Sequence, residues 1–434
     1  MLRLVLAGAA PEGRDDARLP VLGIAALAFT LRLGLWVAFQ ARALASLRRS
    51  IPFWLGAYPE FIAYPENLVH GEGYHFQSPL FGDFWTMRPP LYSLLLASLL
   101  RLFGSADLPP VLVQAIIGAL SAALAFAIAR RLFGRQAGLA AGVLVAVYPY
   151  YIAHDVVRQE IVLFAFLNAA AILLLLRAQA GSMARDAFGA GAVLGLAALT
   201  RQTLLAFIPL AALWLGAFTA RRRARGVLLL LAGVMVVVTP WMVRNALIVG
   251  RPVFTTSTGI GLWWSHTPGL LNHYPREFVD RAALEYWDSY PPEVRTRVAA
   301  MPETERDRWW REQAWAYIRT HPREEVRGAA VKAVVALGLV KSPSSGYPTD
   351  LLYLAIYVPL LLAAGLGAWT ERARWRETLL FFLLFLSYFA PAVMTWSHTN
   401  HRIFLDLYLM VLASVPLSRL CGRVVGWVGP DRTR

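Results

Sequence analysis

Cysteine, lysine and charge are all scarce in this sequence. Its 434 residues include one cysteine, Cys421, and two lysines, and only 16% of the residues are charged. A single cysteine excludes a disulfide within the chain. A hydrophobic share of 57% exceeds the roughly 45–50% of ordinary soluble domains. We therefore expect a polytopic membrane protein.

Nucleotide-binding signatures are also missing. The sequence contains no phosphate-binding glycine loop, dinucleotide fingerprint or G-x-S-x-G elbow, so a nucleotide-dependent reaction is not expected. The net charge of +15 comes from arginines in short clusters between apolar runs, which is typical of topology signals and not of a nucleic-acid surface. Residues 1–18 hold only a short apolar run followed by mixed charge, so we expect the first span to be retained and not cleaved as a signal peptide.

Ten apolar runs are long enough, or nearly so, to cross the hydrocarbon core of a bilayer. They are residues 19–41, 109–129, 136–153, 160–177, 187–200, 202–220, 226–243, 350–370, 377–396 and 403–420. If the run at 89–104 also crossed the membrane, the arginine-rich loops described below could not all lie on one side. We therefore expect an interfacial or re-entrant helix there. The glycine-rich run at 187–200 is expected to pack tightly against neighbouring helices.

Arginine clusters set the expected orientation, because short arginine-rich loops stay in the cytoplasm. The clusters occupy 129–136, 177–186, 221–225, 371–377 and 419–423. An even number of expected membrane spans separates each cluster from the next, so all five clusters can lie on the same side of the membrane. With a cytoplasmic amino terminus, the outer segments are 42–108, 154–159, 200–202, 244–349 and 397–402. The two long loops are both outside, so we expect the chemistry on the outer face.

Candidate catalytic carboxylates occur in two of these outer segments. The stretch "AYPEFIAYPENLVHGEGY" holds Glu60, Glu66 and Glu72. In "VYPYYIAHDVVRQE", Asp155 and Glu160 flank a short turn. An acidic residue at the end of a span is costly to bury and is commonly functional, although a helix cap by Asp155 is an equal alternative.

Arginines on the same face could hold an anionic phosphate. The candidates are Arg88, Arg201, Arg244 and Arg402, of which one or two would also be explained by ordinary lipid-headgroup contact. His154, His398 and His401 are candidate substrate-binding groups. The spacing of His398 and His401 is only a weak metal signal, and a hydrogen-bonded turn explains it more simply.

The long outer loop is expected to form amphipathic helices over the outer mouth. In "MPETERDRWWREQAWAYIRTHPREEVRGAAVK", Trp309, Trp310, Ala314, Tyr317 and Ile318 recur at helical spacing, and residues 304–307 favour a helix start. Such an aromatic stripe is more often packed core than a sugar-stacking surface.

Six motifs taken together resemble the polytopic glycosyltransferases of the GT-C fold. In order, they are "ENLVHGEGY…RPPLYSLLLASLLRLFG", "ARRLFGRQAGLAAGVLVAVYPYYIAHDVVRQE", "GLAALTRQ", "PWMVRNALIVGRPVFTTSTGIGLWW", "AYIRTHPREEVRGAAVK" and "HRIFLDLYLMVLA". The resemblance runs from about Arg32 to Leu417. It is strongest to the glycosyltransferase 39-like proteins, which are related to protein O-mannosyltransferases and to the aminoarabinose transferase of lipid A.

The resemblance implies a donor sugar linked to a polyprenyl phosphate and an acceptor on the periplasmic side. It also implies a direct displacement, in which an acid of the first outer loop deprotonates the acceptor and arginines stabilise the leaving phosphate. The aspartate that commonly precedes a tyrosine and "ENL" in the family is replaced by Ala57, and Phe61 takes the tyrosine place. One helical turn later, Glu60 stands four residues before Tyr64, so Glu60 is the expected base, assisted by Glu160 or Asp155, with Tyr64 near the substrate. Glu66, Glu72 and Asp83 are the alternative bases.

The predicted protein is thus all-α, with a GT-C fold of about 10–12 transmembrane helices, in a bacterial inner membrane. We expect a transmembrane catalytic module over 1–249, a periplasmic helical region over 250–349 and carboxy-terminal transmembrane helices over 350–434. Expected partners are the bilayer, the lipid-linked sugar and a glycan, lipid or protein acceptor, and not nucleic acid. No cofactor is required; a divalent metal is compatible with the chemistry. The alternatives are a lipid-linked saccharide flippase or transporter, and a glycan polymerase or ligase.

Overall fold

The computed structural model describes residues 15–40, 59–104, 107–181, 183–219 and 223–428. Ala57 and the first fourteen residues therefore lie outside the described residues. The described part is almost wholly helical, as the composition predicts. Its one sheet is a short antiparallel hairpin that the sequence reasoning missed, with β1 (Phe76–Ser78) paired to β2 (Gly82–Phe84).

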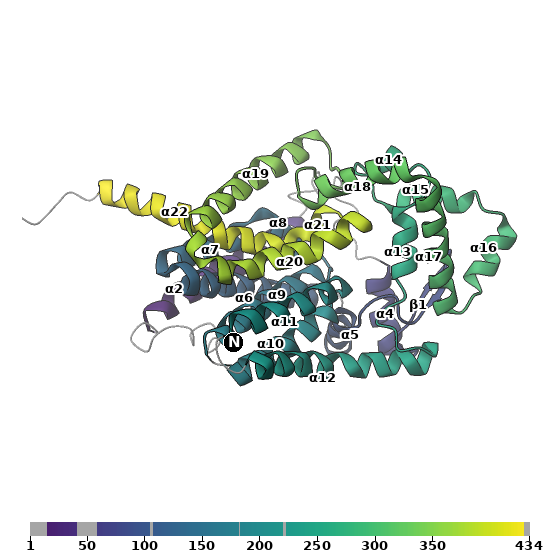
Figure 1. Ribbon diagram of the computed structural model, residues 1–434, viewed down its shortest axis with the longest axis horizontal. Helices are drawn as coiled ribbons and strands as arrows, with labels where there is room; N and C mark the ends of the chain where they lie inside the picture. The colour runs from purple at the N-terminus through teal and green to yellow at the C-terminus, as the bar shows by residue number, and fades with distance from the viewer. Residues whose placement is uncertain (1–14, 41–58, 105–106, 182, 220–222, 429–434) are drawn as a thin grey trace, which may run out of the picture.

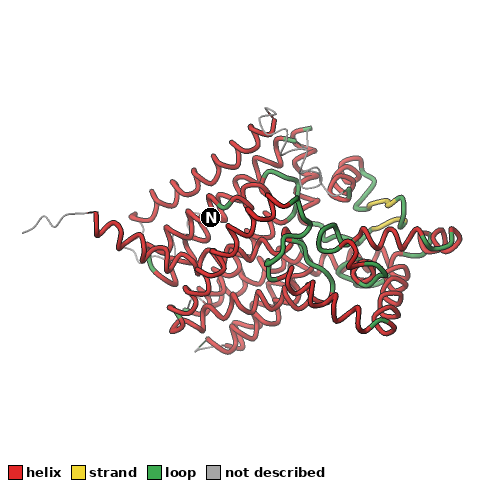
Figure 2. Tube along the Cα trace, turned by 90° about the horizontal axis from the view of Figure 1, so that it is seen from above, coloured by secondary structure: helices red, strands yellow, loops and turns green. Residues whose placement is uncertain are grey.

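The membrane-type helices form a bundle (Figures 1 and 2). In chain order they are α2 (Asp15–Gln40), α6 (Leu108–Phe133), α7 (Arg135–Val147), α8 (Pro149–Asp155), α9 (Ile161–Gln179), α10 (Met183–Ala198), η2 (Gln202–Ala206), α11 (Phe207–Phe218), α12 (Arg223–Val249), α19 (Tyr347–Thr370), η3 (Arg372–Arg374), α20 (Trp375–Met394), α21 (Thr399–Arg402), η4 (Ile403–Leu405) and α22 (Asp406–Val428).

Within the described residues, each of the ten apolar runs is mainly helical. Seven of the described helices are long and apolar enough to cross a membrane, or eight if the bent pair α7–α8 is one span. The number is below the expected 10–12 because the runs at 187–200 and 202–220 form shorter helices. The bend of 52° between α7 and α8 follows from Pro149, which lacks a backbone donor and so begins a new helix.

The glycine-rich helix α10 packs closely against α12, as expected. A Cβ atom on Gly191 would lie only 1.9 Å from the carbonyl oxygen of Leu230. The two backbones can approach this closely only because Gly191 has no side chain. Replacing Gly191 with any larger residue would push the two helices apart.

The outer segments carry shorter helices on one end of the bundle, shown on the right of Figure 1. The first segment holds α4 (Glu60–His70), the hairpin and α5 (Leu91–Phe103). The second holds α13 (Thr258–Ser265), α14 (Leu270–His273), α15 (Asp280–Asp288), α16 (Pro292–Ala299), α17 (Glu303–Thr320) and α18 (Pro322–Ala336). The 13-residue α5 is too short to be counted among the candidate spans.

The aromatic stripe of α17 is packed core, as expected from its spacing. Trp310 is 1% exposed and contacts Trp263 and Trp287 at ring-centroid distances of 4.3 and 4.8 Å. Phe81, from the first outer segment, packs edge-on against Trp310 at 5.6 Å. The two long outer segments therefore share one aromatic core.

Candidate functional site

Hydrogen bonds join the outer segments at one end of the bundle. The amide of Leu91 donates to the carbonyl of Leu199 at 2.9 Å, and the amide of Thr399 donates to Ser342 at 2.7 Å. Arg244 donates to the carbonyl of Tyr74 at 2.9 Å. Segments that are far apart in sequence thus meet on a single face, and the candidate site residues lie on these segments.

Glu60 and Arg88 form an ion pair at the start of α4. Nη2 and Nε of Arg88 lie 2.5 and 3.0 Å from Oε1 of Glu60. The side chain of Glu60 is 8% exposed and that of Arg88 is 32% exposed. Pro89, which directly follows Arg88, disfavours a helical backbone conformation at Arg88. The guanidinium of Arg88 also lies 5.8 Å from the ring of Phe61.

The other first-segment acids point elsewhere. Glu66, Glu72 and Asp83 are all exposed. Tyr64 is fully buried and stacks on Tyr74 at 4.1 Å. Burial raises the pKa of Tyr64 well above its ordinary value, so its phenol stays protonated. Of these four acids, Glu60 alone is buried beside a cation.

A second acid–arginine pair joins Glu160 to Arg201. Nη1 of Arg201 lies 3.3 Å from Oε1 of Glu160, with side-chain exposures of 14% and 9%. Glu160 immediately precedes α9, and Arg201 occupies the turn between α10 and η2. The ring of Phe164, one turn along α9, lies 5.8 Å from the Arg201 guanidinium and contributes a cation–π contact.

A chain of contacts runs from the first pair toward the second. Phe61, whose ring lies 5.8 Å from the Arg88 guanidinium, packs edge-on against Tyr92 at 5.2 Å. The phenol of Tyr92 in turn donates to Oε1 of Gln114 at 2.6 Å.

Gln114 holds the turn that carries Glu160. Its Oε1 accepts from the phenol of Tyr92 at 2.6 Å, and its Nε2 donates to the carbonyls of Asp155 and Val157 at 2.9 and 2.6 Å. The side chain is 2% exposed. Gln114 was not among the sequence candidates, because a single glutamine within an apolar span has no distinctive spacing.

Asp155 is buried in an ion pair with Arg32, a residue that the sequence reasoning did not select. Nε of Arg32 contacts Oδ2 of Asp155, and the side chains are 0% and 1% exposed. Arg32 also donates to the carbonyls of Ala28 and Ala146. A Cβ on Gly118 would lie 2.0 Å from Oδ2 of Asp155, so this glycine makes room for the pair. The pair ties α8 to α2.

Arg402 is also enclosed within the bundle. It donates to Asp406 at 2.8 Å and to the phenol oxygen of Tyr353 at 3.0 Å. Its guanidinium lies 3.9 Å from the ring centroid of Tyr357. Tyr148 donates to the other Asp406 oxygen at 2.8 Å. Arg402 and Asp406 are each 1% exposed. Their bonds to Tyr353 and Tyr148 join the start of α22 to α19 and to the end of α7.

Arg244 anchors the first outer segment to α12. It donates to the carbonyls of Trp85 and Tyr74 at 2.6 and 2.9 Å and to Asn245 at 3.1 Å. Its guanidinium lies 5.0 Å from the Trp241 ring. Its hydrogen bonds go to the polypeptide that carries Glu60 and Arg88, which positions these residues.

The three histidines predicted to bind substrate, His154, His398 and His401, lie at the same end of the bundle as the two acid–arginine pairs. His154 contacts Oε1 of Gln159 at 3.2 Å, and Nδ1 of His398 lies 2.9 Å from Oγ of Ser342. His398 and His401 have ring centroids 5.6 Å apart. Across the residues that the structure describes, no group of three or more histidine, cysteine or acidic side chains could hold a metal ion.

Comparison of the whole fold defines its class. The oligosaccharyltransferase of Archaeoglobus fulgidus, in complex with zinc and sulfate, superposes with a TM-score of 0.51 at 16% identity, covering 94% of this chain and 50% of that one. The same protein tethered to an acceptor peptide gives 0.52 at 15% identity, with 95% and 50% coverage. The predicted GT-C fold is confirmed, and the chain spans about half the length of the archaeal protein.

The family comparison is more specific. Residues 87–243 match the dolichyl-phosphate-mannose-protein mannosyltransferase family, which confirms for this region the resemblance seen in the motifs. The matched region includes Arg88, Asp155, Glu160 and Arg201. ArnT of Cupriavidus metallidurans bound to undecaprenyl phosphate gives a TM-score of only 0.37 at 16% identity, with 92% and 81% coverage. A sequence comparison with curated proteins finds no significant match.

Proposed function

We propose that this chain is a membrane glycosyltransferase that transfers a sugar from a polyprenyl-phosphate donor to an acceptor hydroxyl, with Glu60 as the general base. One observation carries the proposal: two acid–arginine pairs, Glu60–Arg88 and Glu160–Arg201, lie at the end of the bundle where the outer segments meet, and contacts through Phe61, Tyr92 and Gln114 run between them. The family match over residues 87–243 supports it, since three of these four residues fall within that region.

The proposed reaction is a single displacement. The acceptor oxygen attacks the anomeric carbon while its proton moves to the Glu60 carboxylate. The bond from that carbon to the phosphate oxygen breaks, and its electron pair stays on the phosphate. The polyprenyl phosphate leaves with an additional negative charge and needs no proton. Positive groups that face this oxygen therefore stabilise the transition state more than the bound donor.

Arg88 and Arg201 are the proposed phosphate ligands. Both side chains are partly exposed, and a guanidinium offers several donors to phosphate oxygens. Glu160 orients Arg201, while His401, His154 and His398 line the substrate region. Arg244, Arg402, Asp155 and Tyr64 are proposed to support the site from behind. Arg244 binds backbone carbonyls, Arg402 and Asp155 are held in fully buried ion pairs, and Tyr64 is buried against Tyr74.

The proposed location is the bacterial inner membrane, with the site facing the periplasm. This orientation rests on the rule that short arginine-rich loops stay in the cytoplasm. Two of the clusters, 371–377 and 419–423, contact each other through the ion pair of Glu371 and Arg419. In this account residues 250–349 form a helical roof over a site that residues 1–249 carry, and residues 350–434 complete the bundle.

A lipid-linked saccharide transporter is the main alternative, since Asp406 is a buried acid within a membrane-type helix. Its pairing with Arg402 and Tyr148 supports a structural role instead. A glycan polymerase or ligase would share the lipid phosphate chemistry and differ only in its acceptor.

The test uses purified protein in liposomes with a polyprenyl-phosphate monosaccharide and a panel of lipid, glycan and peptide acceptors. The proposal expects free polyprenyl phosphate to appear together with glycosylated acceptor. Movement of intact donor between leaflets without cleavage would instead favour the transporter. Analysis of the lipid-linked saccharide that accumulates in a deletion strain would identify the sugar.

A further inference from the structure

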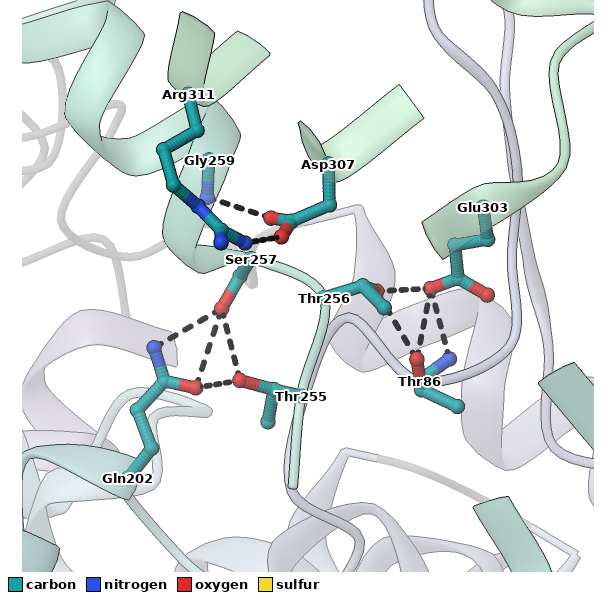
Figure 3. Close-up of polar contacts among 9 residues, drawn as sticks. All are labelled: Thr86, Gln202, Thr255, Thr256, Ser257, Gly259, Glu303, Asp307 and Arg311. Carbon is teal, nitrogen blue, oxygen red and sulfur yellow. Dashed lines mark hydrogen bonds and ion pairs between the residues drawn. The ribbon is translucent and has the colours of Figure 1, made fainter. Parts of the chain in front are cut away.

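Three consecutive hydroxyl residues, Thr255, Thr256 and Ser257, lie between Gln202 on one side and Thr86 and Glu303 on the other (Figure 3). We call these three residues the strap. They come from the "FTTSTG" part of a motif to which the proposed function assigns no role. Their side chains alternate in direction. Thr255 and Ser257 face Gln202, whereas Thr256 faces Thr86 and Glu303.

One side of the strap binds the residue that follows Arg201. Nε2 of Gln202 donates to Oγ of Ser257 at 3.0 Å. Oε1 of Gln202 accepts from Thr255 and lies 3.2 Å from Oγ of Ser257. Both ends of the Gln202 amide are therefore occupied by the strap, and the η2 turn that begins at Gln202 is fixed relative to it.

The other side binds the segment that leads into Arg88. The amide of Thr256 donates to the carbonyl of Thr86 at 3.2 Å, and the two hydroxyls lie 3.0 Å apart. Glu303, at the start of α17, accepts from the amides of Trp85 and Thr86 at 2.7 and 3.0 Å. It also accepts from the hydroxyls of Thr86 and Thr256. Glu303 and Thr256 are 8% and 2% exposed.

Glu303 is a buried carboxylate that accepts hydrogen bonds from four neutral donors. Losing any of these donors would leave the buried charge less well stabilised, so the donor groups are held in place. Thr86 precedes Arg88 by two residues, and the intervening Met87 is buried in the aromatic core. Asp307, one turn along α17 from Glu303, accepts from the amide of Gly259 at 2.5 Å. Helix α17 thus holds the strap at Thr256 and holds the chain again at Gly259, two residues beyond the strap.

We propose that the strap sets the separation of Arg88 and Arg201, which makes Thr256 and Glu303 positioning residues for the phosphate site. The inference rests on the proposed function. The strap joins the two phosphate ligands through residues that neighbour them in sequence, Thr86 and Gln202. Loosening it would misplace both guanidinium groups, and a displacement of about 1 Å costs roughly a hundredfold in rate.

The test compares hydroxyl-deleting and hydroxyl-keeping variants. Thr256→Val removes the hydroxyl contacts with Glu303 and Thr86 and keeps the backbone bond to Thr86, whereas Thr256→Ser keeps a hydroxyl there. Thr258→Val is the matched control, because Thr258 adjoins the strap and is exposed. Glu303→Gln is paired with Glu305→Gln, an exposed acid on the same helix. Each purified variant is assayed for kcat, acceptor KM, polyprenyl-phosphate affinity and amide hydrogen exchange.

We expect Thr256→Val and Glu303→Gln to lower kcat by about ten- to a hundredfold with acceptor KM within about twofold. Exchange should accelerate at the amides of residues 85 and 86. Thr256→Ser and both controls should stay within about twofold of wild type. The proposal is overturned if Thr256→Val exchanges faster but keeps wild-type kcat and donor affinity, or if Thr256→Ser is as impaired as Thr256→Val. Wild-type protein that neither binds polyprenyl phosphate nor cleaves the donor would overturn the proposed function, and the strap's role with it.

Discussion

Glu60 accepts two hydrogen bonds from Arg88 through the same oxygen atom, Oε1. Nε and Nη2 of Arg88 lie 3.0 and 2.5 Å from it. One carboxylate oxygen is therefore held by the arginine, and we expect the other, Oε2, to receive the proton of an acceptor hydroxyl. This geometry suits a base that must be oriented and must still receive a proton.

Replacing Arg201 should weaken binding of the lipid phosphate. Loss of a charge-assisted hydrogen bond costs about 1.5–3 kcal/mol, so Arg201→Ala should lower the affinity for polyprenyl phosphate by roughly ten- to a hundredfold. Arg201→Lys should lose less, because it keeps the charge. Arg251→Ala serves as the control, since Arg251 is exposed near the end of α12. Equal affinity in Arg201→Ala and Arg251→Ala would contradict the phosphate role.

The Arg32–Asp155 pair should behave as a structural unit. Asp155→Ala leaves the buried guanidinium of Arg32 without its partner charge, which costs about 3–5 kcal/mol. Replacing both residues, as in Arg32→Met with Asp155→Leu, should be less destabilising than Asp155→Ala alone. Thermal unfolding in detergent measures the difference. If Asp155→Ala keeps wild-type stability but loses turnover, Asp155 is catalytic and this account of it is wrong.

The pH dependence of stability should carry a contribution from His398. Burial lowers the pKa of His398 from 6.5 to about 3, so the folded protein keeps the ring neutral. Below pH 6.5 the unfolded chain takes up a proton that the folded chain does not. The free energy of unfolding therefore decreases as the pH is lowered. At pH 5 the free energy of unfolding is lower by about 2 kcal/mol than at neutral pH because of this group.

His398→Phe removes this proton uptake while keeping an aromatic ring among Trp396, Tyr274 and Phe278. The unfolding midpoint of the variant should therefore fall less than that of wild type between pH 7.5 and pH 5. Parallel curves for the two proteins would show that His398 does not titrate differently on folding.

Hydropathy predicted most of the fold because a span must be both long and apolar. The ten runs became helices, and the parity of the arginine clusters grouped the outer segments as the structure does. The predicted number of spans was too high, because some apolar runs form helices that are too short to be counted as spans. One example is α10, a short helix whose glycines pack closely against α12. The hairpin β1–β2 was missed because its strands have three residues each, too few for a clear alternation.

The site was predictable only in part. Glu60 and Arg88 were selected because both lie in one outer loop beside the membrane. The partners of Asp155 and Thr86 could not be found, since Arg32 is 123 residues from Asp155 and Glu303 is 217 residues from Thr86. The Arg402–Asp406 pair is different: its spacing of four residues on a helix is a local signal that favours pairing.

The central claim is that Glu60 accepts the proton of the acceptor hydroxyl. Glu60→Gln keeps the size of the side chain and an oxygen that can accept from Arg88, but it removes the basic carboxylate. Turnover of a polyprenyl-phosphate sugar is measured together with donor affinity, and Glu66→Gln serves as the control because Glu66 is exposed on the same helix.

The account predicts that Glu60→Gln lowers kcat by roughly 10²–10⁴-fold, the usual contribution of a general base, while donor affinity stays within about threefold of wild type. Glu66→Gln should keep wild-type turnover. Near wild-type turnover by Glu60→Gln would contradict the assignment of Glu60 as the base.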